Sequence, residues 1–148
     1  MTTFLLAVHV LAAIVAIGPV AVAASAFPPA ARRVQGSPED GQALGVVRNL
    51  HRICRVYAVV GVTVPVFGLA TAKNMGVLGD AWLIASMALT AVAAVVLGAL
   101  ILPGQSAVLD DPGAAVAGRL AMYTGVFNLL WATVTVLMIV RPGSTTGA

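Results

Sequence analysis

The two histidines are the residues whose chemistry stands out, because each lies in or beside a long apolar segment. His9 interrupts the run FLLAVHVLAAIVAIGPVAVAASAF, and His51 precedes a second apolar run. A neutral imidazole is the commonest metal ligand in proteins, and an ionisable side chain inside a membrane is a functional candidate by default. Binding of haem or copper is therefore the first chemistry to consider.

The spacing of the histidines argues against one metal shared by both. If the apolar runs cross a membrane, His9 lies near the outer end of the first span and His51 lies at or beyond the inner end of the second. A rise of 1.5 Å per helical residue then separates them by more than about 20 Å along the membrane normal. A second ligand for His9 could come from Met138 or Met75 instead, since methionine is an ordinary axial ligand of haem or copper. The alternative is a neutral His9 that hydrogen-bonds to a neighbouring helix.

Four apolar stretches must position these side chains. Hydrophobic residues make up 60% of the chain and charged residues only 9%, and the mean hydropathy is +1.02. Soluble domains usually carry about 25% charged residues. Crossing a membrane takes about 20 predominantly apolar residues, and the stretches that qualify are roughly 4–26, 56–72, 81–102 and 120–140. We therefore expect one domain, residues 1–148, that is an all-α integral membrane four-helix bundle.

Positive charge predicts how the bundle is oriented. The first loop carries five arginines, whereas the second carries only Lys73; the five are Arg32, Arg33, Arg48, Arg52 and Arg55. By the positive-inside rule the first loop is cytoplasmic, so both termini lie outside and residues 103–118 lie inside. We expect a multi-pass protein of the bacterial cytoplasmic (inner) membrane.

The basic residues before the second span form one stripe of a helix that continues that span. Arg48, Arg52 and Arg55 can reach anionic lipid headgroups while their stems lie along apolar surface; the alternative is a site for an anionic substrate. Residues 28–44 are polar and rich in Gly and Pro, and we expect a mobile loop that could dock a partner. No basic face with interleaved aromatic residues is present, so nucleic acid is not an expected partner.

The faces of the first and last spans predict which side chains point inward. His9 shares its face with Ala13, Ala16 and Ala23, and small residues allow membrane helices to approach closely. In the last span one face carries Ala121, Thr124, Asn128, Trp131, Ala132 and Thr135. An unsatisfied amide in hydrocarbon costs several kcal/mol, so Asn128 should hydrogen-bond to a neighbouring helix or bind a ligand. The candidate polar interior is His9, Thr124, Asn128, Trp131 and Met138.

Catalytic patterns are missing from the sequence. All five carboxylates, Glu39, Asp40, Asp80, Asp110 and Asp111, fall in loops or at helix ends, whereas proton-coupled transport and intramembrane aspartyl chemistry normally need a carboxylate within a span. No G-x-S-x-G, H-E-x-x-H or P-loop pattern occurs. A non-enzymatic protein is the expectation.

Short motifs give the chain a family resemblance over nearly its whole length. They are Val8-His9-Val10-Leu11, Gly18, the basic entry to the second span, Trp82, and the closing segment 136–143. In these the chain resembles a family of small bacterial four-helix membrane proteins of unknown function. His9 is also similar to the first-helix histidine of the copper-resistance D membrane domain and of the membrane-bound protoporphyrinogen oxidase that binds haem. That resemblance implies haem or copper ligation by His9, although those proteins place Trp and Gly soon after the histidine, where this chain reads Ala16-Ile17-Gly18-Pro19.

Three hypotheses for function follow. The first is a non-enzymatic accessory subunit or small-molecule-binding bundle, which forms a homo-oligomer or joins a membrane-protein partner through its small-residue faces. The second is a haem- or copper-binding protein of the inner membrane that uses His9. The third is a passive transporter or channel, which the lack of charged residues within the spans disfavours.

Overall fold

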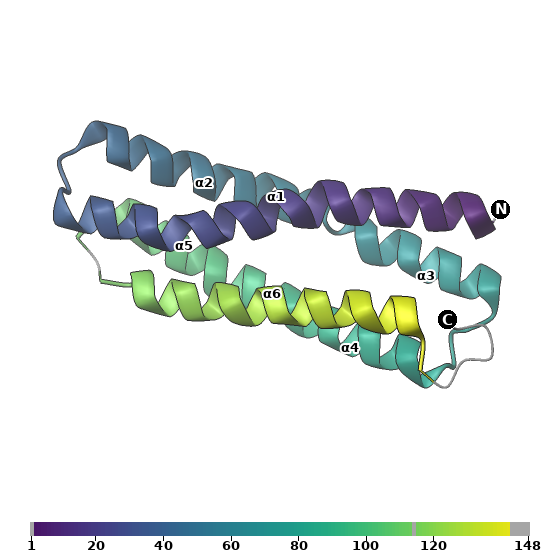
Figure 1. Ribbon diagram of the computed structural model, residues 1–148. Coiled ribbons are helices and arrows are strands. Elements are labelled where there is room, and N and C mark those ends of the chain that lie inside the picture. Colours follow the sequence, from purple (N-terminus) through teal and green to yellow (C-terminus); the bar gives the residue numbers. More distant parts are fainter. Residues whose placement is uncertain (1, 114, 143–148) are drawn as a thin grey trace.

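The computed structural model describes residues 2–113 and 115–142, and within these ranges it contains helices and no strand. The elements are α1 (Thr2–Gly36), α2 (Gly41–Val60), α3 (Thr63–Met75), α4 (Ala81–Val95), the π-helical η1 (Val96–Ile101), α5 (Leu102–Asp110) and α6 (Ala117–Val140). They form four rods, each long and apolar enough to cross a membrane (Figure 1). The prediction of an all-α four-helix membrane bundle is confirmed.

Each of the four rods contacts the next one along the chain, and the fourth contacts the first. Helix α1 contacts α2, α3 and α6, while α6 also contacts α4 and η1, and α5 contacts α2. The start of α1, the end of α6 and the α3–α4 connection share one end of the bundle, which we call the terminal end. The α1–α2 and α5–α6 connections share the other (Figure 1). We call this the arginine end, because Arg32, Arg33 and Arg48 lie near it.

The prediction of a loop over residues 28–44 is wrong. Helix α1 continues through Pro28 and Pro29 to Gly36, and α2 begins at Gly41, so the connection is residues 37–40. A proline inside a helix leaves the carbonyl four residues earlier without its donor. For Pro28 that carbonyl belongs to Ala24, and the hydroxyl of Thr124 in α6 donates to it at 3.4 Å. The tertiary contact supplies what the helix lacks, and this supports helix through the proline pair.

The second rod is broken where α2 meets α3. Pro65 offers no N–H to the Gly61 carbonyl, and the Val64 N–H bonds to that carbonyl instead, at 3.1 Å. The Val60 carbonyl thereby loses its usual helical donor, and the Thr63 hydroxyl takes its place at 2.8 Å. A break at this point lets α3 leave the direction of α2 while its backbone groups stay paired.

The third rod also extends beyond its predicted end at residue 102. The Leu102 N–H bonds to the Leu97 carbonyl, five residues back, and this places a π-helical segment just before Pro103. Helix α5 then runs to Asp110, so most of the loop expected from residue 103 is helix. Because Pro103 sits in the first turn of α5, its missing N–H costs the new helix little.

The first three rods are longer than a bilayer core requires, with 30 or more residues each. Helix α1 has 35 residues, or about 52 Å at 1.5 Å per residue, against about 30 Å of hydrocarbon. An apolar cluster lies toward the arginine end, made of Phe27, Ala30, Ala31, Val34, Ala43, Val47, Val108, Ala117 and Leu120. Nearly all its members lie outside the predicted spans. We call residues 27–55 and 103–119 the headpiece, a section of the bundle with its own apolar core.

Candidate functional site

His9 lies between α1 and α3 toward the terminal end. Its Nδ1 is 2.9 Å from the Val64 carbonyl oxygen, and because a carbonyl only accepts, Nδ1 carries the proton. The ring rests on Gly68, where a Cβ atom would lie 2.9 Å from His9 Cε1. The expected hydrogen bond between His9 and a neighbouring helix is thus observed. In the neutral ring Nε2 keeps its lone pair, and it has no hydrogen-bond partner among the described residues.

The methionines considered as second ligands lie at the same end of the bundle. Met75 and Met138 pack against an apolar cluster formed by Ala72, Val77, Trp82 and Leu83. Within residues 2–113 and 115–142, no group of three or more His, Cys, Asp or Glu side chains could hold a metal ion. Ligation of haem or copper by His9, with or without Met138, stays a prediction.

The polar residues of α6 join it to α1. Asn128 Nδ2 donates to Ser25 Oγ at 3.2 Å, and Trp131 Nε1 donates to Asn128 Oδ1 at 3.0 Å. Asn128 therefore makes the predicted bond to a neighbouring helix, one turn from the contact of Thr124 with the Ala24 carbonyl. Of these bonds, only that of Thr124 reaches a backbone carbonyl that Pro28 leaves without its helical donor.

The packed face of α6 differs from the predicted one. Thr124 is buried as expected, but Ala121, Ala132 and Thr135 are exposed, and Leu120 and Phe127 are buried in their place. Helix α6 sits between α1 and the α4–η1 rod, and the gap between two helices is filled by larger side chains. A helix that is apolar on all sides gives little sequence signal of which side is packed.

A second polar cluster surrounds His51, where α2 meets α5. His51 is 6% exposed, Gln105 1% and Cys54 0%. His51 Nδ1 lies 2.9 Å from Gln105 Oε1, and its Nε2 lies 3.3 Å from Ser106 Oγ. Gln105 Nε2 in turn donates to Cys54 Sγ at 3.5 Å. Four side chains from two helices thus form one continuous hydrogen-bonded row.

The order of donors in this row follows from the chemistry of its members. Since the Gln105 amide nitrogen donates to sulfur, the amide oxygen faces His51 and can only accept. His51 Nδ1 must therefore carry a proton. In the neutral ring Nε2 then holds a lone pair, and the Ser106 hydroxyl donates to it. The row fixes the imidazole in the tautomer whose unprotonated nitrogen faces a hydroxyl.

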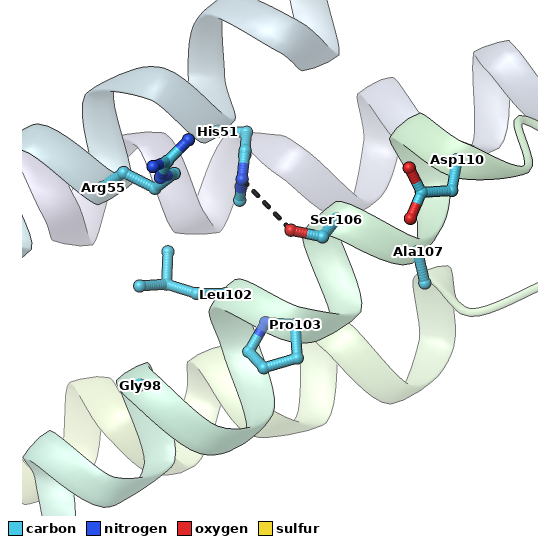
Figure 2. Close-up of a pocket in the computed structure, with 8 residues that line it drawn as sticks. All are labelled: His51, Arg55, Gly98, Leu102, Pro103, Ser106, Ala107 and Asp110. Atoms are coloured by element: carbon cyan, nitrogen blue, oxygen red, sulfur yellow. Dashed lines mark hydrogen bonds between the residues drawn. The ribbon is translucent and has the colours of Figure 1, made fainter.

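The serine end of the row opens into a hollow of about 470 Å³, which we call the interfacial hollow. Its lining residues are His51, Arg55, Gly98, Leu102, Pro103, Ser106, Ala107 and Asp110. Figure 2 shows the Ser106 hydroxyl directed at His51, with Arg55 on one side of this pair and Asp110 on the other. The hollow lies at residues 51–55 and 98–110, where the second predicted span begins and the third ends. It therefore sits at the boundary between apolar rods and headpiece.

The arginines of α2 remain available at this boundary. Arg48, Arg52 and Arg55 are exposed. Among the described residues, none of their guanidinium groups forms an ion pair or a hydrogen bond. Arg48 and Arg52 line a smaller hollow of about 200 Å³ together with Gly45 and Asn49. Arg55 alone of the three lines the interfacial hollow.

Sequence reasoning missed Gln105 and Ser106. Both follow Pro103-Gly104, and the sequence predicts that the third span ends just before this pair. The available signal was the polar Gln-Ser pair next to a long apolar run, together with His51 and Cys54 one helical turn apart. Only the continuation of the third rod as α5 brings these residues together.

The chain matches no family model, no curated protein and no solved structure. The resemblances drawn from short motifs therefore stay predictions.

Proposed function

We propose that this multi-pass membrane protein resides in the bacterial inner membrane, with its arginine end in the cytoplasm and both termini outside. We propose further that it is a binding protein for an amphiphile with an anionic headgroup, held in the interfacial hollow. One observation carries this proposal: the same hollow is lined by the guanidinium of Arg55, which has no partner among the described residues, and by the apolar side chains of Leu102 and Pro103. The excess of arginine at this end supports the orientation.

The chemistry of the lining suggests how such a ligand would lie. A guanidinium presents a planar fork of donors that suits a carboxylate or a phosphate. Beyond its chain neighbours and its own helix backbone, Gly98 has no described atom within 4 Å of the place a Cβ would occupy, so the wall beside Leu102 is open to an acyl chain. Asp110 lies on the other side of the His51–Ser106 pair (Figure 2), and its carboxylate repels an anion from that side. The headgroup is therefore placed at Arg55 and the chain along η1.

The test compares two arginines of one helix. Binding of a fluorescent fatty acid would be measured on the full chain in neutral detergent, for Arg55→Ala and for the control Arg52→Ala. Both substitutions remove one positive charge from an exposed site of α2, but only Arg55 lines the interfacial hollow. A charge-assisted hydrogen bond contributes about 1.5–3 kcal/mol, which solvent exposure lowers to about 1 kcal/mol, or about fivefold in Kd. Equal weakening by both variants would show that binding is only general charge attraction.

A second candidate function rests on His9. Its Nε2 lone pair has no partner within the described residues, and Nδ1 is held by Val64. A histidine whose second ring nitrogen donates to a carbonyl has the orientation expected of a metal ligand. This observation favours haem or copper binding near the terminal end, and an optical spectrum tests it, as set out in the Discussion.

A further inference from the structure

The row formed by Gln105, His51 and Ser106 has the order found in a nucleophilic site: an orienting acceptor, a base and a hydroxyl. The base and the hydroxyl are 3.3 Å apart and the orienting bond is 2.9 Å. Nucleophile–base distances are often somewhat loose in unliganded sites. We propose that Ser106 is a nucleophile, that His51 activates it, and that the interfacial hollow hydrolyses carboxylic esters of fatty acids.

The burial of the row supports a catalytic role for it, beyond the mutual satisfaction of its polar groups by hydrogen bonds. Gln105 is 1% exposed and His51 is 6% exposed. The Gln105 amide nitrogen donates to Cys54 Sγ, so its oxygen accepts from His51 Nδ1 and fixes His51 in a single tautomer. A neutral amide can orient a catalytic histidine, as the asparagine of Cys-His-Asn proteases does. Ser106 is the least buried member of the row and faces the hollow. The lone pair of His51 Nε2 thus faces the one hydroxyl among the residues that line the hollow.

Arg55 supplies the positive charge that an ester reaction requires. A tetrahedral intermediate places negative charge on the former carbonyl oxygen, and a preorganised donor near that oxygen stabilises it. Arg55 has no partner among the described residues and lines the same hollow as Ser106. The oxyanion would occupy the place that the proposed function gives to an anionic headgroup. The fatty acid released by hydrolysis is itself such an amphiphile, so the substrate class rests on the proposed function, whereas the nucleophile rests on the row alone.

The reaction balances with water as the only co-reactant. Ser106 Oγ forms a bond to the ester carbonyl carbon while its proton passes to His51 Nε2. The bond between that carbon and the alcohol oxygen then breaks, and the alcohol leaves with the proton from Nε2. Water attacks the carbonyl carbon of the acyl-serine and gives one proton to Nε2. The bond between that carbon and Ser106 Oγ then breaks, the fatty acid departs, and the proton passes from Nε2 to Ser106 Oγ. One ester and one water yield one fatty acid and one alcohol.

The test uses an alkyl fluorophosphonate on the full chain in detergent. Attack by Ser106 forms a P–O bond, fluoride leaves, and mass analysis of peptides locates the label. We expect the protein to be labelled at Ser106, and the labelling rate to fall about 100-fold or more in Ser106→Ala and in His51→Asn, the range for loss of a nucleophile or a general base. The control is Ser25→Ala, because Ser25 is an exposed helical serine whose hydroxyl bonds to Asn128 rather than to a histidine; this variant should label normally.

Gln105 acts through His51 and is a positioning residue, which calls for a rescue experiment. Gln105→Met keeps the volume and removes the acceptor, so labelling should slow, whereas Gln105→Glu keeps an oxygen facing His51 and should restore it. A purely structural Gln105 would give equal labelling in two variants that fold equally well by circular dichroism.

The outcomes separate the two proposals. Wild-type protein that binds fatty acid but is not labelled, or a Ser106→Ala variant labelled like wild type, overturns the nucleophile and leaves the proposed function standing. Labelling at Ser106 in a protein that binds no fatty acid overturns the proposed function, and with it the ester class, but upholds the nucleophile.

Discussion

Gly68 offers the sharpest test of the packing between α1 and α3. A Cβ atom at this position would lie 2.9 Å from His9 Cε1 and 3.2 Å from His9 Nδ1, where ordinary contact begins at 3.4 Å. In Gly68→Ala the two helices must separate by about 0.5 Å, or the ring must turn away and lose its 2.9 Å bond to the Val64 carbonyl. Either response destabilises the bundle.

The expected loss combines three contributions. Overpacking costs about 1–3 kcal/mol, and an interhelical hydrogen bond in a membrane contributes about 0.6–1.7 kcal/mol where it is lost. Alanine gains about 1 kcal/mol over glycine in a helix. We expect a net decrease in the free energy of unfolding of about 1–2 kcal/mol, measured by SDS titration in mixed micelles and followed by circular dichroism.

Two further variants show whether His9 causes that loss. Gly125 lies within α6 with no atom within 4 Å of its missing Cβ, so Gly125→Ala should be neutral or slightly stabilising. In a His9→Ala background the ring is gone, and Gly68→Ala should then cost much less than in the wild type. Two results would show that overlap between the added Cβ and the His9 ring does not cause the loss of stability. One is equal stability of Gly68→Ala and Gly125→Ala, and the other is an unchanged loss from Gly68→Ala in the His9→Ala background.

Three other predictions concern single side chains. Asn128→Ala should lower the free energy of unfolding by about 1 kcal/mol, because the hydrogen bond between α1 and α6 is lost. The control is Thr133→Ala, which should change this free energy little because the Thr133 hydroxyl bonds to a carbonyl of α6 itself. Equal losses in the two variants would contradict the interhelical role of Asn128. Cys54 is fully buried, so a maleimide should modify it only after SDS unfolding, and rapid modification of the folded protein would refute the His51–Gln105–Cys54 packing. If His9 ligates haem, protein purified after haem-replete expression should show a Soret band that shifts on reduction with dithionite and is lost in His9→Ala, whereas a featureless spectrum would leave His9 a hydrogen-bond donor alone.

The apolar rods could be predicted from the sequence because their signal is local. A run of about 20 apolar residues identifies a span without knowledge of its neighbours, and the structure has four such rods. The helix ends could not be predicted in the same way. Pro28 and Pro103 are local signals for a stop, yet a hydroxyl from α6 and a π-helical turn accommodate them. Such compensation depends on partners about 100 residues away or on a rare backbone geometry, and a local pattern shows neither.

The residues of the candidate sites also differ in whether their signal in the sequence is local. His9 could be selected because an ionisable residue in a hydrocarbon segment is conspicuous, and Asn128 for the same reason. Ser106 and Gln105 are ordinary residues for a loop, and their chemistry depends on His51, which is more than 50 positions away. Once residues 102–110 are helical, one turn of α5 presents both side chains to opposite nitrogens of a single ring.

The headpiece explains why this site lies where it does. An acyl ester in a membrane has its carbonyl at the boundary of the hydrocarbon, where the chain is buried and water is near. The row around His51 forms outside the predicted spans because α1 continues through its proline pair and the third rod continues through η1, so that the helices remain packed there. Had the rods ended at residues 26 and 102, as their prolines suggest, His51 would face lipid headgroups with no acceptor for Nδ1 and no hydroxyl at Nε2. The irregular helix segments are thus the features that bring His51, Ser106 and Arg55 to one hollow just outside the predicted spans.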